Sequence, residues 1–154
     1  MAQVVNGARR GEILLIEDRN EVREGLAQLL ELHGYMVTEV ANADHGMREL
    51  AAQPNAFALV VLDLMLGDSM AGVDFRRRQL LEPHLAAVPT IVITATEMGD
   101  DDRAPLRPDA WLEKPFRFDT LLELVKRHVV SEGSALLASD QGPLEEPAET
   151  GVRP

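Results

Sequence analysis

The chain has 154 residues and a formal net charge of −11, which disfavours direct binding to the phosphates of nucleic acid. It has no Cys, and this excludes disulfides and metal sites built on thiolates. No apolar run reaches the length of a signal peptide or a membrane span, so we expect a cytoplasmic protein that does not associate with membranes.

Short apolar strands and amphipathic helices are predicted to alternate along the chain. The predicted strands are residues 13–16, 35–40, 58–62, 89–93 and 110–112. Apolar residues at helical spacing predict helices through residues 22–30, 42–52, 75–81 and 118–130, with Pro83 closing the third of them. Most of the strands are continuously apolar, which is typical of a parallel sheet covered by helices on both faces.

Residues 97–109, where a fourth helix should follow the fourth strand, contain Gly99, three successive Asp, Pro105 and Pro108. Because prolines interrupt helices, we expect at most a short helix and an irregular connection there.

The triplet Arg76-Arg77-Arg78 is interpreted as a solvated face of the third helix, because the acidic total argues against a nucleic-acid patch.

Acidic and hydroxyl side chains stand where the predicted strands end. Asp63 ends the third strand, Glu17 and Asp18 follow the first, and Thr94 follows the fourth. These ends should meet at the carboxyl edge of a parallel sheet, where carboxylates that repel one another can be joined by a divalent cation such as Mg²⁺. Asp63 could then attack a phosphoryl donor, and the ammonium group of Lys114 could neutralise the phosphoryl oxygens.

Four ordered segments resemble the receiver domain of bacterial two-component response regulators. They are Ile-Leu-Leu-Ile-Glu-Asp, Val-Val-Leu-Asp-Leu-Met-Leu, Ile-Val-Ile-Thr-Ala-Thr and Leu-Glu-Lys-Pro-Phe. The resemblance implies an α/β, flavodoxin-like, doubly wound parallel sheet of five strands in the order 2-1-3-4-5. It covers residues 11–130, leaving residues 1–10 as a flexible leader and residues 131–154 as an acidic, mostly disordered tail.

The resemblance also implies a role for each site residue. Asp63 would be the phosphoacceptor, Thr94 the switch hydroxyl and Lys114 the salt-bridge partner of the phosphoryl group. The implied Mg²⁺ ligands are Asp18, Asp63, the backbone carbonyl of Met65 and, through water, Glu17. Trp111 stands at the family's rotameric switch position, although partial burial for packing is the simpler interpretation of this side chain.

Some positions depart from the family pattern. Gly67 stands where the family commonly has Pro, and the loop to Gly72 looks one residue longer. Met65 and Thr96 occupy positions that affect phosphoryl lifetime, and neither is a water-positioning acid or amide. We therefore expect slow hydrolysis of the aspartyl phosphate and no enzymatic turnover. The interrupted fourth helix alters the surface that the family commonly uses for dimers and output, so a homodimer is left open.

The resemblance implies a single-domain response regulator, because only 24 residues follow Val130. The phosphoryl group would come from a histidine kinase or a histidine phosphotransfer protein, and the signal would pass by contact with a protein target that the sequence does not identify. A phosphorelay intermediate or phosphate sink remains an alternative, as does an adaptor that keeps only the fold. An aspartyl phosphatase is disfavoured, because that class needs a second Asp where this chain has Met65.

Overall fold

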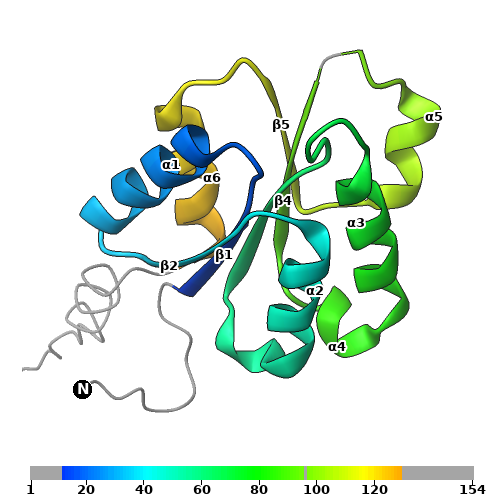
Figure 1. Ribbon diagram of the computed structural model, residues 1–154, viewed down its shortest axis with the longest axis horizontal. Helices are drawn as coiled ribbons and strands as arrows, with labels where there is room; N and C mark the ends of the chain where they lie inside the picture. The colour runs from blue at the N-terminus through cyan, green and yellow to red at the C-terminus, as the bar shows by residue number, and fades with distance from the viewer. Residues whose placement is uncertain (1–11, 96, 130–154) are drawn as a thin grey trace, which may run out of the picture.

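The computed structural model describes residues 12–95 and 97–129 (Figure 1). Five parallel strands form one sheet in the order β2-β1-β3-β4-β5, as predicted. The strands are β1 (Glu12–Ile16), β2 (Met36–Val40), β3 (Leu59–Asp63), β4 (Thr90–Ala95) and β5 (Ala110–Lys114). The leader and tail proposed from the sequence, and Thr96, lie outside the described residues.

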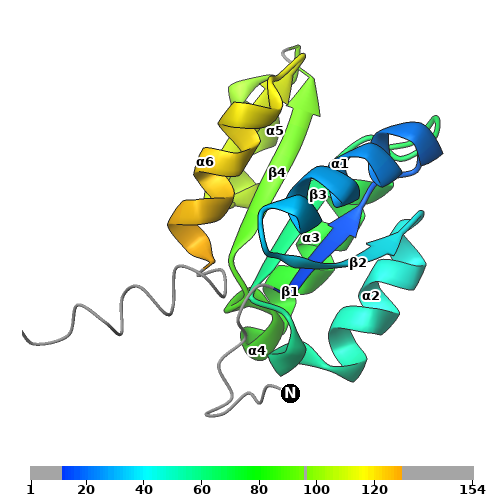
Figure 2. The same cartoon turned by 90° about the vertical axis from the view of Figure 1, so that its left-hand side faces the viewer.

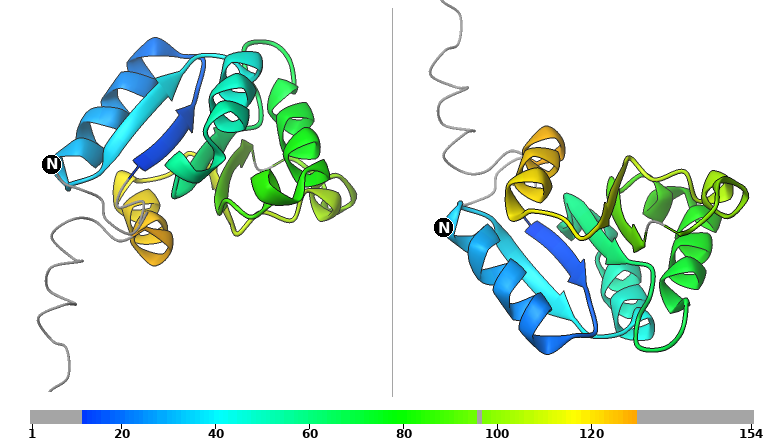
Figure 3. Two further views of the ribbon diagram at one scale, coloured as in Figure 1. Left: turned by 90° about the horizontal axis from the view of Figure 1, so that it is seen from below. Right: turned by 90° about the horizontal axis from the view of Figure 1, so that it is seen from above.

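Helices cover both faces of the sheet (Figures 2 and 3). On one face lie α1 (Asn20–Leu32) and α6 (Phe118–His128); on the other lie α2 (Ala43–Ala52), α3 (Ala71–Leu81), the one-turn helix α4 (Pro83–Ala86) and α5 (Asp100–Arg103). Two 3₁₀ turns, η2 (Pro54–Ala56) and η3 (Ala104–Leu106), complete the elements. No helix in the described part of the chain is long and apolar enough to cross a membrane.

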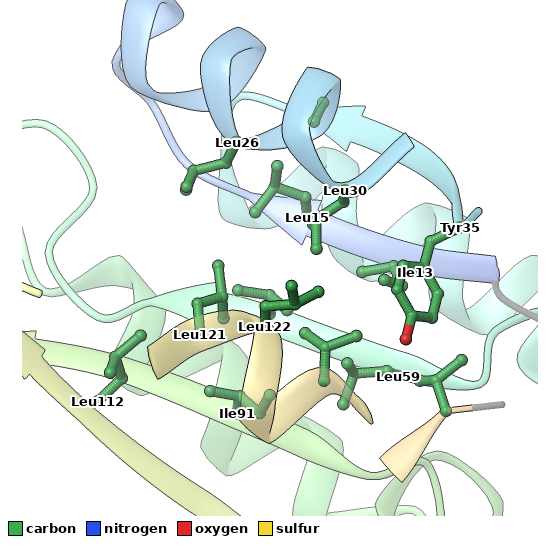
Figure 4. Packing of buried hydrophobic residues seen from close by; sticks show 14 of the residues in the cluster. Ile13, Leu15, Leu26, Leu30, Tyr35, Leu59, Ile91, Leu112, Leu121 and Leu122 are labelled. Atoms are coloured by element: carbon green, nitrogen blue, oxygen red, sulfur yellow. The ribbon is translucent and has the colours of Figure 1, made fainter. Parts of the chain in front are cut away.

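Burial on both faces explains why the central strands are continuously apolar. Residues 13–16 of β1 and residues 59–62 of β3 are all fully buried. Ile13 and Leu15 pack beneath α1 and α6 (Figure 4), whereas Leu14 packs in the second cluster with side chains of α2 and α3. A strand with no solvent-facing side cannot show an alternating pattern, so the interpretation as a parallel, doubly covered sheet is confirmed.

The ends of several elements differ from the sequence prediction. β4 and β5 run past the predicted ends to Ala95 and Lys114, because these two residues are register partners. The sequence pattern does not predict the helix α4, since a proline after a helix is typical of a stop. Glu82 is extended, and Pro83 then occupies the first position of a new helix, where its missing N–H leaves no hydrogen bond unmade.

The connection from β4 to β5 is short and irregular, as predicted. Helix α5 is a single turn, and η3 follows it directly. The chain leaves η3 through Arg107, which is in the left-handed region (φ 38°, ψ 56°). Pro108 follows and disfavours helical geometry in the residue before it, so the helix cannot continue.

Arg76 corrects the interpretation of the arginine triplet as a solvated face. Arg77 and Arg78 are exposed, but Arg76 is only 2% exposed. Its guanidinium donates to the carbonyl oxygens of Leu106 (2.8 Å) and Arg107 (2.7 Å) and to Gln79 Oε1 (2.7 Å). Burial lowers the pKa of this guanidinium. Arg76 therefore ties α3 to the irregular segment that replaces a full fourth helix.

Candidate functional site

Asp63, the last residue of β3, is 1% exposed and is the centre of the candidate site. Its Oδ1 accepts a hydrogen bond from the backbone N–H of Met65 at 2.9 Å. Its Oδ2 lies 2.8 Å from Nζ of Lys114, at the end of β5. Oδ2 is buried, and apart from this ion pair it has no hydrogen-bond partner among the described residues. It is paired with an ammonium group and can still accept a further cation.

Glu17 places a second carboxylate beside Asp63. It follows β1, is 3% exposed and accepts a hydrogen bond from the backbone N–H of Arg19 at 2.9 Å. Burial is the main cause that raises the pKa of Glu17 to about 7, and the nearby carboxylate of Asp63 also raises it, although the Arg19 N–H and Lys114 lower it. Two carboxylates that resist joint ionisation in this way would be stabilised by a divalent cation.

Asp18, the second acid that follows β1, lies beside the loop that contains Gly67. It is half-buried and lines a cavity of about 380 Å³ together with Asn42, Asp44 and Gly67. In residues 12–95 and 97–129, no three carboxylate, imidazole or thiol side chains meet closely enough to form a ready metal site. Mg²⁺ commonly takes one or two carboxylates and keeps several waters, so the Glu17 and Asp63 oxygens fit it without a third acid in place.

Thr94 lies on β4, the strand next to that of Asp63, and Trp111 lies on β5, one strand further away; among the described residues neither side chain forms a hydrogen bond with Asp63. Thr94 is 3% exposed, and its hydroxyl donates to the carbonyl of Ala95 (3.3 Å) and to Sδ of Met98 (3.5 Å). Trp111 is half-buried, and the guanidinium carbon of Arg103 lies 5.1 Å from its ring centroid. Sequence reasoning missed Met98 and Arg103, since neither belongs to a motif or to a helical period.

The loop after Asp63 contains a tight turn that explains the Gly at position 67. Leu66 and Ser69 exchange backbone hydrogen bonds of 2.9 and 3.3 Å, and Gly67 between them has φ +70°. A proline is fixed near φ −65° and could not adopt this conformation. The departure from the family pattern is therefore accounted for by the geometry of the turn.

Gly72→Ala is expected to destabilise the protein by about 2–3 kcal/mol, because overpacking against a rigid neighbour has costs of this order. A Cβ at this position would overlap the carbonyl oxygen of Asp63 and the Cα of Leu64. Gly25→Ala, inside α1 with no atom near its added Cβ, should instead stabilise by about 0.5–1 kcal/mol. Urea unfolding of both variants checks this, and equal midpoints would contradict the close packing of Gly72.

The raised pKa of Glu17 predicts a pH dependence of stability in metal-free protein. The folded state holds this proton up to about pH 7, whereas the unfolded state releases it near 4.5, the ordinary pKa of a glutamate side chain. The resulting stabilisation is present below the unfolded pKa and is lost as the pH rises through the folded pKa. Between pH 5 and pH 7 the wild type should lose about 2 kcal/mol more than Glu17→Gln. Urea unfolding in EDTA tests this, and parallel stability curves would contradict it.

The fold and this edge of the sheet define a class of protein. It is a doubly wound α/β domain with a buried aspartate ending the central strand, an acid following the first strand and a lysine ending the last. The family model of the response regulator receiver domain matches residues 13–126. The chain therefore belongs to the receiver domain family of response regulators.

Its relatives include proteins of different lengths. The response regulator receiver protein CpdR of Brucella abortus is 30% identical over 120 residues, covering 77% of this chain and 97% of that protein. The transcriptional regulatory protein YkoG of Bacillus subtilis is 31% identical over 127 residues, covering 81% of this chain and 54% of that protein. The chain thus spans about half of YkoG and nearly all of CpdR.

A solved structure supports the fold. The response regulator receiver domain protein of Methanospirillum hungatei superimposes with a TM-score of 0.64 at 25% identity, covering 77% of this chain and 92% of that chain.

Proposed function

We propose that this protein is a cytoplasmic response regulator that accepts a phosphoryl group on Asp63 and passes the signal on by contact with another protein. The observation that carries the proposal is the buried Asp63 carboxylate, 2.8 Å from the Lys114 ammonium and beside Glu17. A histidine kinase or a histidine phosphotransfer protein would supply the phosphoryl group. The match over 97% of CpdR, a response regulator receiver protein, supports a role in phosphoryl-dependent signalling.

The transfer step exchanges one bond to phosphorus for another. An Asp63 oxygen attacks the phosphorus of a phosphohistidine, the P–O bond forms as the P–N bond breaks, and the imidazole leaves and takes up a proton. Lys114 is already within ion-pair distance of Asp63 and would neutralise a phosphoryl oxygen. The hydroxyl of Thr94, one residue along β4 from the register partner of Asp63, is the nearest candidate donor on that strand.

Mg²⁺ is the metal we propose for the site. Glu17 and Asp63 would hold it, joined by the Met65 carbonyl and by Asp18. When bound, it supplies positive charge that offsets the charge of the transferring phosphoryl group. The buried Oδ2 of Asp63, with no hydrogen-bond donor among the described residues, is what supports a cation at this position.

The test is incubation with a small phosphodonor such as acetyl phosphate and Mg²⁺, followed by mapping of the modified residue. We expect an acyl phosphate on Asp63 that hydroxylamine releases and that does not form in EDTA. A protein that stays unmodified, or is modified at another residue, would favour the adaptor that keeps only the fold. Rapid return of the phosphoryl group to a histidine phosphotransfer protein would favour the relay or sink.

A further inference from the structure

The hydroxyl of Thr94 bonds within its own loop, to Met98 and Ala95, and not to Asp63. The side chain of Thr94 is almost fully buried, and its hydroxyl donates to Met98 Sδ at 3.5 Å and to the Ala95 carbonyl at 3.3 Å. A thioether is a weak acceptor, so this bond is easily exchanged for one to a charged oxygen. The resting position of the hydroxyl therefore depends on where the loop between β4 and α5 holds Met98.

Arg103 fixes this loop to the edge of the sheet. Its Nε donates to the carbonyl of Met98 at 3.1 Å, and its Nη2 donates to Glu113 Oε2 at 2.7 Å. The same guanidinium lies over the ring of Trp111 at 5.1 Å. Glu113 is the register partner of Thr94 on β5, so one side chain joins the loop to the strand beside the switch hydroxyl.

The shortness of α5 makes these side-chain contacts important. Arg103 ends a four-residue helix, and a single helical turn has little stability of its own because helix formation is cooperative. The side chain of Arg103 is 18% exposed, so its ion pair with Glu113 is partly shielded from solvent. The contacts of this one residue supply order that a full fourth helix would otherwise provide.

We propose that Arg103 is a positioning residue that sets the balance between the resting and phosphoryl-bound positions of Thr94. It holds Met98 where the Thr94 hydroxyl can bond to it, and it holds the ring of Trp111 by a cation–π contact. Movement of Thr94 toward a phosphoryl group on Asp63 breaks the bond to Met98 and disturbs the Arg103 contacts. The inference rests on the proposed function, since it concerns the switch at the same site.

The experiment compares Arg103→Gln with the wild type in a titration with beryllofluoride and Mg²⁺, which stand in for the phosphoryl group and its metal. Trp111 is the single Trp of the chain, so fluorescence excited at a wavelength that Tyr35 does not absorb reports on this location alone. We expect Arg103→Gln to respond at about fivefold to tenfold lower beryllofluoride, where tenfold corresponds to about 1.4 kcal/mol. Removing a positive charge should by itself weaken anion binding, so tighter binding identifies release of the loop.

The matched control is Arg117→Gln, which removes an exposed arginine paired only with Asp119 at 3.2 Å. Its midpoint should stay within about twofold of the wild type, as expected for an exposed ion pair. Arg103→Lys keeps the charge but loses the planar fork, so it should fall between the wild type and Arg103→Gln. If Arg103→Gln does not fold, Met98→Leu, which removes the thioether acceptor, should also tighten binding.

Several outcomes would overturn the inference. In one of them, the wild type responds to beryllofluoride while Arg103→Gln binds it with equal or weaker affinity. That result would show that Arg103 does not favour the resting position of Thr94. A wild type that does not respond at all would count against the proposed function instead. In that case the emission of Trp111 without ligand still tests the contact, since Arg103→Gln should change it and Arg117→Gln should not.

Discussion

Asp63→Asn is expected to abolish incorporation of a phosphoryl group and to leave the fold intact. An amide cannot form an acyl phosphate under these conditions, since it lacks the nucleophilic carboxylate oxygens. Asn keeps the shape of the side chain and can still accept the 2.9 Å hydrogen bond from the Met65 N–H. Lys114 is 37% exposed, so its ammonium can be solvated when the partner charge is lost. Labelling with a phosphodonor and urea unfolding measure the two effects.

The matched control for this variant is Asp68→Asn. Asp68 is an exposed acid in the same loop, five residues further along the chain. This variant should take up the phosphoryl group at the wild-type rate, because the Asp68 side chain is exposed and the Lys114 ammonium is paired with Asp63. Labelling that persists in Asp63→Asn, or that is lost equally in both variants, would remove Asp63 from its proposed role.

The sheet and the position of its acidic edge were predictable because they follow from short-range patterns. Continuous apolar runs such as residues 13–16 and 59–62 have no solvent-facing side, and this is typical of strands in a parallel sheet covered on both faces. Once the sheet is parallel, the ends of its strands share one edge. This is why Asp63 and Lys114 form an ion pair although 51 residues separate them, as their numbers in the chain show.

What the sequence did not predict depends on contacts between side chains from separate segments. Asp18 directly follows Glu17, yet it lines a different cavity, and no periodic pattern encodes that orientation. Met98 and Arg103 act through the Thr94 hydroxyl and the Trp111 ring, which are contacts of the folded chain. Positive φ at Gly67 could be anticipated only in general terms, since glycine permits this conformation without requiring it.

The sequence pattern also does not show which arginine of the triplet is buried. Arg76 and Arg77 are adjacent residues of the same type, yet they have opposite environments. Arg77 is 63% exposed, whereas Arg76 is buried. Successive helical residues point about 100° apart, so one arginine of a triplet can face the interior. What keeps it there is a set of acceptors on the irregular segment: the carbonyl groups of Leu106 and Arg107, which end η3. The prolines that interrupt the fourth helix thus create the acceptors that bind Arg76.

Arg76→Met is expected to lower the free energy of unfolding by about 2–4 kcal/mol. Methionine has a similar length but no donor, so it leaves the carbonyls of Leu106 and Arg107 and the Gln79 Oε1 without their hydrogen bonds. Each buried acceptor left unsatisfied costs about 1–3 kcal/mol, and relief from burying a charge offsets part of the sum. Urea unfolding monitored by circular dichroism measures the change.

Arg77→Met provides the control, since Arg77 makes only a 4.0 Å ion pair with Asp74 on the surface. Its unfolding free energy should stay within about 0.5 kcal/mol of the wild type. Arg76→Lys should be intermediate, because one ammonium group cannot reach acceptors spread over Gln79 and two successive carbonyls. If Arg76→Met were as stable as Arg77→Met, the guanidinium would not be what holds η3 against α3, and packing of the buried Leu106 alone would have to do so.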